Sequence, residues 1–233
     1  MSGGKMESGE RQPAYLYDLL GEPRPFAEVD RLQLDLAAAR SQHAVPDTIV
    51  LCEHPPTLTL GRASDAEAEL PGGESAYRAL GWEVQRADRG GRSTWHGPGQ
   101  LVCYPILDLR DHGKDLRRYA HDLERVVIDA LASFGIAAAA GEDREHVGVW
   151  VEERKIASLG IRASNWVVHH GFALNVDCDL TAFARFRACG LDATPFTSIA
   201  RELGRDVTVA EARGPVLDAL AEVFSLELST VPA

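Results

Sequence analysis

Three strand-like segments follow one another between residues 147 and 176, and they constrain the fold more than any other part of the sequence. Residues 147–151, 155–163 and 166–176 are rich in apolar side chains, and only short turn-forming stretches separate them. Strands so close in sequence pair as antiparallel neighbours, because a parallel pairing needs a crossover of a dozen or more residues. The sequence therefore predicts an antiparallel meander here.

Helices are predicted on both sides of this meander. Residues 114–134 repeat apolar side chains on one helical face, and Gly135 follows as a C-terminal stop. A helix that opens at Thr208 has a capping box, and Pro215 is expected to kink or split it. Other helices are expected over residues 27–40, 180–187 and 195–203. Further strands are expected over residues 48–53, 57–61, 82–87 and 101–109, and a surface loop over residues 63–75.

The size and composition fit one globular domain. A chain of 233 residues buries about 70% of its unfolded surface, and its 45% hydrophobic and 25% charged residues are close to globular averages. Residues 1–12 are expected to form a disordered tail before a single domain over residues 13–233. No apolar run reaches the roughly 20 residues that span a bilayer, and no signal peptide is recognisable. We therefore expect a cytoplasmic protein with no membrane partner.

The formal net charge of −11 disfavours binding to nucleic acid, which requires Lys and Arg to neutralise phosphates. One segment differs, because eight Lys and Arg residues stand against six Asp and Glu between Arg86 and Arg125. This basic segment is a candidate docking surface for an acidic partner. The alternative is that its arginines are solvated or pair with neighbouring acids.

No metal site is predicted. The histidines that could be considered, His54, His96, His146 and the pair His169 and His170, match no known ligand spacing. Adjacent residues of a strand point to opposite faces, so we expect the last two to be separated by the sheet.

A glycine-rich stretch joins two predicted strands, with the sequence Arg89-Gly-Gly-Arg-Ser-Thr-Trp-His-Gly-Pro-Gly-Gln100. Its glycines let the backbone approach a ligand and expose N–H groups, so it could hold an acyl chain or a carbonyl oxygen. It does not match the phosphate-binding loop patterns. The alternative is a long turn, but twelve residues that include Trp95 and His96 exceed what a hairpin needs.

Cys189 is the best candidate for a nucleophile among the four cysteines. It follows a predicted helix and precedes a glycine, a position that can leave a thiol at a loop surface. Cys52 and Cys103 lie within apolar strands and fit a buried structural role, which is also the alternative for Cys189. Two flanking aspartates would raise the pKa of the Cys178 thiol. No G-x-S-x-G elbow is present, so a serine hydrolase is excluded.

Lys155 is one of only three lysines, against twenty-one arginines. Strand alternation is expected to place its side chain on the same face as Ala157 and Leu159, toward a partly buried cleft. Burial there would favour the neutral amine and make it usable as a base. The alternative is an exposed lysine at a strand edge.

Four segments together resemble the lipoyl(octanoyl) transferases, which move an octanoyl group from acyl carrier protein to lipoyl domains. They are the glycine-rich stretch above, Arg154-Lys-Ile-Ala-Ser-Leu-Gly-Ile-Arg162, His170-Gly-Phe-Ala-Leu-Asn175 and Ala188-Cys-Gly-Leu191. They appear in the order of that family, and the similarity extends from about residue 15 to about residue 225. The family commonly has proline where this chain has Ala188.

The resemblance implies an α/β (α+β) fold of the biotin and lipoate protein ligase type, with a mixed sheet flanked by helices. It assigns Cys189 as the nucleophile that takes the octanoyl group as a thioester, and Lys155 as the residue that lowers the thiol pKa and exchanges protons. The residues it implies for the acyl pocket are Arg89, Gly90, Gly91, Arg92, Ser93, Thr94, Trp95, His96, Ser158, Leu159, Gly160, Gly171, Phe172 and Ala173.

The implied donor is octanoyl-acyl carrier protein. The implied acceptors are the lipoyl domains of 2-oxoacid dehydrogenase complexes and the glycine cleavage H protein. Thioester exchange is nearly isoenergetic and amide formation from a thioester runs downhill, so no ATP, metal or other cofactor is expected. Two alternatives stay open: an ATP-dependent lipoate or biotin ligase, and a catalytically silent homologue that binds carrier domains.

Overall fold

The computed structural model describes residues 11–141, 147–188 and 195–231. The strands are β1 (Gln12–Asp18), β2 (Asp47–Cys52), β3 (Thr57–Leu60), β4 (Glu83–Arg86), β5 (Thr94–His96), β6 (Gln100–Asp108), β7 (Ala139–Ala140), β8 (Val149–Val151), β9 (Arg154–Ser164), β10 (Val167–Asn175) and β11 (Leu226–Thr230). The helices are α1 (Phe26–Ser41), α2 (Ala66–Glu69), α3 (Gly73–Ala79), α4 (Leu116–Ala132), the 3-10 helix η1 (Leu180–Arg185), α5 (Ile199–Leu203) and α6 (Val209–Val223).

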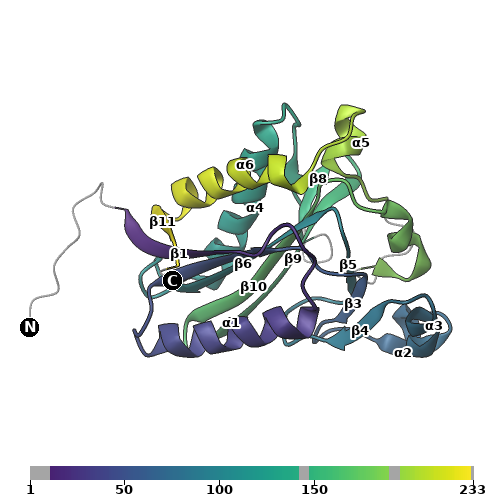
Figure 1. Cartoon of the computed structure of the whole chain (residues 1–233), viewed down its shortest axis with the longest axis horizontal. Helices are drawn as coiled ribbons and strands as arrows, with labels where there is room; N and C mark the ends of the chain where they lie inside the picture. The colour runs from purple at the N-terminus through teal and green to yellow at the C-terminus, as the bar shows by residue number, and fades with distance from the viewer. Residues whose placement is uncertain (1–10, 142–146, 189–194, 232–233) are drawn as a thin grey trace, which may run out of the picture.

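A mixed sheet forms the centre of the molecule. Its strand order is β11-β1-β2-β6-β10-β9-β8-β7. The β1 strand pairs in parallel with β11 and with β2, and the other pairings are antiparallel. Figure 1 shows α1 below this sheet and α4 and α6 above it. The expected fold class, a mixed sheet flanked by helices, is confirmed.

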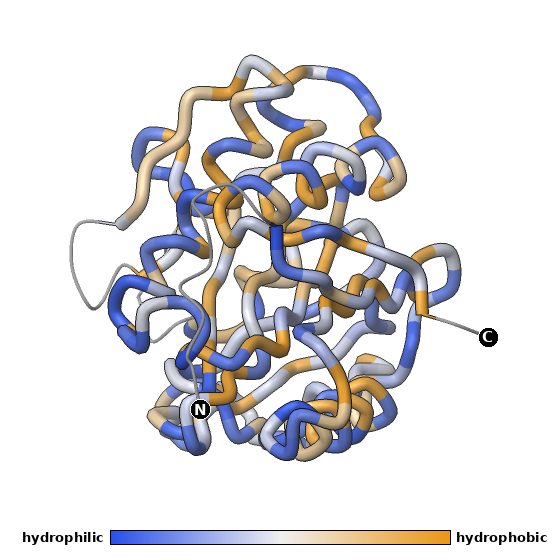
Figure 2. Tube along the Cα trace, turned by 90° about the vertical axis from the view of Figure 1, so that its left-hand side faces the viewer, coloured by the Kyte–Doolittle hydropathy of each residue, from blue (hydrophilic) through white to orange (hydrophobic). Residues whose placement is uncertain are grey.

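Each face of the sheet has its own apolar core. The larger core lies under α4 and α6, and the smaller one lies between the sheet and α1. Hydrophobic and hydrophilic residues alternate along much of the chain, as expected of elements with one buried and one exposed face (Figure 2). No helix in the described ranges is long and apolar enough to cross a membrane.

The strongest sequence patterns form the elements that they predict. The meander is present as β8, β9 and β10, each antiparallel to the next. The long central helix α4 is capped by Asp115, whose side chain accepts hydrogen bonds from two backbone N–H groups. Gly135 adopts a φ of 74° just beyond the end of this helix, a conformation that glycine reaches without strain.

Several weaker predictions are wrong. Residues 63–75 are not only a loop, because they contain α2 and the start of α3. Residues 195–203 are helical only over α5, and residues 180–185 form a 3-10 helix. The α6 helix continues through Pro215 and is not split there. The glycine-rich stretch contains β5, which pairs with β3 in a second sheet of order β4-β3-β5.

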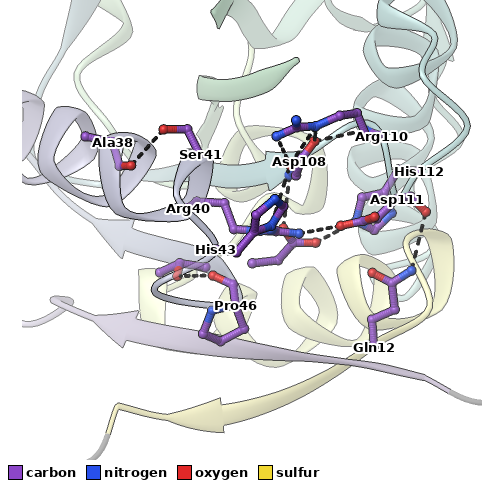
Figure 3. A network of polar contacts seen from close by, with 12 residues as sticks. Gln12, Ala38, Arg40, Ser41, His43, Pro46, Asp108, Arg110, Asp111 and His112 are labelled. Carbon is purple, nitrogen blue, oxygen red and sulfur yellow. Dashed lines mark hydrogen bonds and ion pairs between the residues drawn. The ribbon is translucent and has the colours of Figure 1, made fainter. Parts of the chain in front are cut away.

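A buried charged network holds the end of the sheet where α1 ends, β2 begins and β6 ends. The guanidinium of Arg40 donates to Asp47 at 2.7 Å and to Asp111 at 2.5 Å, and lies 3.8 Å from Asp108. Figure 3 shows Arg40, Asp108 and Asp111 converging in this network. Burial alone would raise the pKa of Asp108, but hydrogen bonds from Arg110 and the nearby charges outweigh it and hold that pKa below its usual value.

We expect Arg40→Met to lower the free energy of unfolding by about 3 kcal/mol at pH 7, because the buried Asp47 carboxylate loses its guanidinium partner and Asp108 loses one of its two nearby arginines. A carboxylate whose folded pKa is lowered stabilises the fold above its unfolded pKa of about 4 and loses that contribution as the pH falls. The wild type and the variant should therefore approach each other in stability below about pH 4. Urea unfolding across pH 3 to 7 checks this, and a difference that stays constant would contradict it.

Candidate active site

A cavity of about 510 Å³ lies between the glycine-rich stretch and strands β9 and β10. Its lining includes Lys155 and all but two of the residues that the resemblance implies for an acyl pocket. The lining residues from that set are Arg89, Gly90, Gly91, Arg92, Thr94, His96, Ser158, Leu159, Gly160, Gly171, Phe172 and Ala173. We call this space the acyl cavity, after the ligand that the resemblance implies for it.

Glycines bring the glycine-rich stretch against β9. The backbone N–H of Gly90 donates to the carbonyl of Ile161 at 2.9 Å. A Cβ added at Gly160 would lie 2.9 Å from Cδ of Arg89 and 3.2 Å from the carbonyl oxygen of Gly90. Only a residue without a side chain permits this approach, which closes one wall of the acyl cavity.

The Arg89 side chain stabilises this wall through hydrogen bonds. It is buried, and its guanidinium donates to the carbonyls of Gly90, Arg92 and Thr59 and to the Thr59 hydroxyl, at distances of 2.7 to 3.1 Å. The structural consequence is a rigid loop whose shape depends on one arginine.

The two remaining residues of the implied set lie elsewhere. The Ser93 N–H donates to the buried carboxylate of Glu69, and its hydroxyl donates to the carbonyl of Arg187. Trp95 belongs to a further apolar cluster, formed by residues of the smaller sheet and of η1, where its ring packs edge-on against Phe183 at 5.6 Å. Neither residue lines the acyl cavity.

Lys155 is 2% exposed, and its side chain lines the acyl cavity. Its ammonium lies 5.4 Å from the centroid of the Trp150 ring, within cation–π range. Lys155 and Leu159 both line the acyl cavity, as expected for two residues that face one cleft, whereas Ala157, expected on the same face, does not line it. The pairing of β8 with β9 skips Ile156, so strict alternation is interrupted there, and Ile156 and Ala157 both pack into the larger core.

The backbone of Lys155 is tied to the segment that follows residue 194. Its N–H donates to the carbonyl of Pro195, and its carbonyl accepts from the N–H of Thr197, both at 2.9 Å. The Asn175 side chain donates to the Thr197 carbonyl at 3.0 Å and accepts from Gln100 at 2.9 Å. Bonds from two sides therefore fix this segment beside Lys155.

Cys189 lies outside the described residues. The other three cysteines are buried. Burial raises the pKa of Cys178 to about 12, with smaller contributions from Asp179 and Asp177, and raises the pKa values of Cys52 and Cys103. None of these three thiols is an effective nucleophile near neutral pH.

The buried end of the acyl cavity contains residues that the sequence analysis did not assign to the pocket. Phe26, Tyr104 and His170 line it together with His96. Burial lowers the pKa of His170 to about 3 and the pKa of His96 well below its usual value, so both rings are neutral at pH 7. A neutral lining suits an apolar ligand. His170 is the first residue of one of the four motifs, and this position could have indicated that it lines the pocket. No motif or pattern in the sequence indicates Phe26.

The expectation that His169 and His170 face opposite sides of the sheet is wrong. Their ring centroids are 4.8 Å apart. His170 has a φ of 57°, and this left-handed conformation breaks the alternation of β10.

Comparisons with known proteins identify the family of this chain. The model of the lipoyl protein ligase A/B catalytic domain family matches residues 27–221. An octanoyltransferase from Rubrobacter xylanophilus is 44% identical over 223 residues, covering 94% of this chain and 98% of the relative.

Two solved structures show the same fold. The crystal structure of a lipoate-protein ligase A bound with ATP has a TM-score of 0.76 at 18% identity, covering 95% of this chain and 90% of that one. The biotin protein ligase from Aquifex aeolicus has a TM-score of 0.50 at 14% identity, covering 91% of this chain and 69% of that one. Taken with the sequence matches, these results show that the chain belongs to the lipoyl protein ligase A/B catalytic domain family and is an acyltransferase of its octanoyltransferase group.

Proposed function

We propose that the protein transfers an octanoyl group from octanoyl-acyl carrier protein to a lysine of a lipoyl domain, through a thioester on Cys189. The acceptors are the lipoyl domains of 2-oxoacid dehydrogenase complexes and the glycine cleavage H protein. The observation that supports this most is the position of Lys155, buried in the wall of the acyl cavity and bonded through its backbone to Pro195 and Thr197.

In the first step the Cys189 thiolate attacks the thioester carbonyl of the donor. A new carbon–sulfur bond forms to Cys189, the bond to the donor sulfur breaks, and that sulfur takes a proton from Lys155. A free thiol of pKa about 8.5 is only a few per cent ionised at pH 7, so a nearby ammonium raises the reactive fraction.

In the second step the amine of the acceptor lysine attacks the new thioester. Lys155, now neutral, takes the proton that the amine loses, the amide forms, and Cys189 leaves as a thiolate. The acyl chain stays in the cavity during both steps, against Phe172, Ala173 and the neutral His170.

Intact mass measurement tests this proposal. Mixing the protein with octanoyl-acyl carrier protein in the absence of ATP is expected to add one octanoyl group, and peptide mapping is expected to place it on Cys189. Adding a lipoyl domain should then move that mass to the acceptor. If the acceptor is modified only when ATP and free octanoate are supplied, the protein is a ligase and the proposal fails.

We expect Gly160→Ala to raise the KM for the octanoyl donor several-fold, because the added methyl group would meet Arg89 and Gly90 and displace the cavity wall. A matched control is Gly214→Ala in α6, where an added Cβ meets nothing within 4 Å. Steady-state kinetics on both variants checks the prediction. Equal KM values would show that the close approach at Gly160 does not shape the substrate site.

A further inference from the structure

A second cavity of about 650 Å³ is lined by described residues that precede and follow the segment 189–194, which carries Cys189. Ala188 and Pro195, the described residues on either side of that segment, both line it. Arg154 lines this cavity, whereas its neighbour Lys155 lines the acyl cavity. The adjacent residues Arg154 and Lys155 therefore line different cavities.

The two cavities differ in charge. Four arginines line the second cavity, and no Asp or Glu is among its described lining residues. They are Arg154, Arg185, Arg187 and Arg201. In a chain with a net charge of −11, such a separation of charge favours an anionic ligand.

Arg185 and Arg201 are the arginines best placed to bind a ligand, because Asp179 and Glu202, the acids within electrostatic range of them, make their side-chain hydrogen bonds to other residues. Glu202 accepts two hydrogen bonds from Arg154 and one from Thr197. Asp179 caps η1 by accepting from the N–H and hydroxyl of Thr181. Both arginines are exposed.

The apolar part of the second cavity is aromatic. The rings of Phe183 and Phe196 are stacked with centroids 3.8 Å apart, and Phe186 packs beside Phe183 at 6.4 Å. All three residues line the cavity. A cavity lined by aromatic rings and by arginine side chains suits a ligand that has an uncharged, flexible chain and one anionic end.

The basic segment between Arg86 and Arg125 is less suited to this role. Most of its arginines are already paired with carboxylates: Arg86 with Glu74, Arg92 with Glu69, Arg110 with Asp108, Arg118 with Asp122 and Arg125 with Asp129. The sequence analysis gave pairing with neighbouring acids as the alternative for this segment. The structure confirms that alternative for these five arginines.

We propose that the second cavity binds the phosphopantetheine arm of the acyl donor, with Arg185 and Arg201 contacting its phosphodiester. This inference rests on the proposed function. The arm has the required form, because its amide-containing chain ends in the acyl thioester and its other end is a phosphodiester. The arginines disfavour entry of a positively charged acceptor lysine, so this cavity discriminates the donor from the acceptor.

The test compares two small donors, octanoyl-phosphopantetheine and octanoyl-pantetheine, which differ only in the phosphate. For acylation of the wild-type protein, we expect kcat/KM to be about tenfold or more higher with octanoyl-phosphopantetheine than with octanoyl-pantetheine. The reason is that hydrogen bonds to charged groups are stronger than those between neutral groups. In the double variant Arg185→Ala/Arg201→Ala this preference should fall to near unity, while the rate with octanoyl-pantetheine stays within about twofold. The preference of the wild type should also shrink with added salt.

A double variant with the same change in charge, Arg31→Ala/Arg213→Ala, removes an exposed arginine of α1 and a half-buried arginine of α6, which pair with Asp35 and Asp18. It should keep the full preference for the phosphorylated donor. Equal rates with the two donors in the wild type, or an undiminished preference in the Arg185/Arg201 variant, would overturn this inference and leave the proposed function standing. Failure of both donors to acylate the protein would overturn the proposed function and this inference with it.

Discussion

Cys189→Ser is expected to abolish octanoyl transfer, with a loss of kcat of about 10⁴-fold or more, because a serine hydroxyl is almost wholly protonated at neutral pH and is a weak nucleophile without a strong base. The variant should show no mass increase on incubation with octanoyl-acyl carrier protein. Substrate binding should be retained, so that the variant competes with the wild-type enzyme for the donor.

Cys178→Ser is the control for this substitution. The Cys178 thiol is buried and donates to the Asn175 side chain at 3.5 Å, a bond that a serine hydroxyl can also make. Its turnover should stay within about threefold of the wild type. If both variants lost activity equally, or if Cys189→Ser turned over normally, the covalent intermediate would have to be abandoned.

Replacing Lys155 should have the next largest effect and should separate its two roles. We expect Lys155→Met to reduce the acylation rate at pH 7 by about 10² to 10⁴-fold, because both the ammonium and the proton donor are removed. The rate should rise as the pH approaches the ordinary thiol pKa of about 8.5, where the thiolate forms without help. Stopped-flow acylation across pH 6 to 9.5 checks this.

Lys155→Arg keeps the positive charge but cannot release its proton, since a guanidinium stays protonated in proteins. Acylation should therefore be slowed less than in Lys155→Met, whereas transfer to the acceptor amine should be slowed strongly. The acyl-enzyme should accumulate, and intact mass during turnover would reveal it. Equal slowing of both steps in both variants, with unchanged pH profiles, would assign Lys155 a packing role in the cavity wall. Circular dichroism melts confirm that each variant is folded, because the lysine is buried.

Elements with a strong local pattern could be predicted from the sequence. The α4 helix repeats buried residues such as Leu123, Val127 and Ala130 on one face, and its cap and stop are local as well. The meander follows from three apolar segments with short turns. In these places local propensity and tertiary packing favour the same structure.

Elements that depend on distant partners could not be predicted with the same certainty. The β5 strand is three residues long and exists because it pairs with β3, which lies more than thirty residues earlier. The α2 helix is four residues long, and its Glu69 accepts from the Ser93 backbone and from Arg92. Local sequence contains neither contact.

The candidate site shows the same division. The sequence motifs identified most of the residues in the cavity wall. The predicted orientation of side chains was wrong at two places, each time because of the backbone at a single residue. The skipped Ile156 changes which residues share a face with Lys155, and the positive φ of His170 brings two imidazoles together. Phe26 reaches the cavity from the first turn of α1, and no periodicity connects it to strands more than a hundred residues later.

The pairing of β1 with β11 joins the two ends of the described chain. Gln12 lies opposite Leu226, and Leu16 lies opposite Thr230, so β1 has a partner on its outer side only after β11, far later in the sequence, is available. A ribosome releases the C-terminal end last, and contacts of such large sequence separation form slowly. Nascent chains that lack the last strand would expose the edge of β1 to pairing with other chains. During synthesis, the time before β11 emerges is therefore the period in which this protein most needs protection from aggregation.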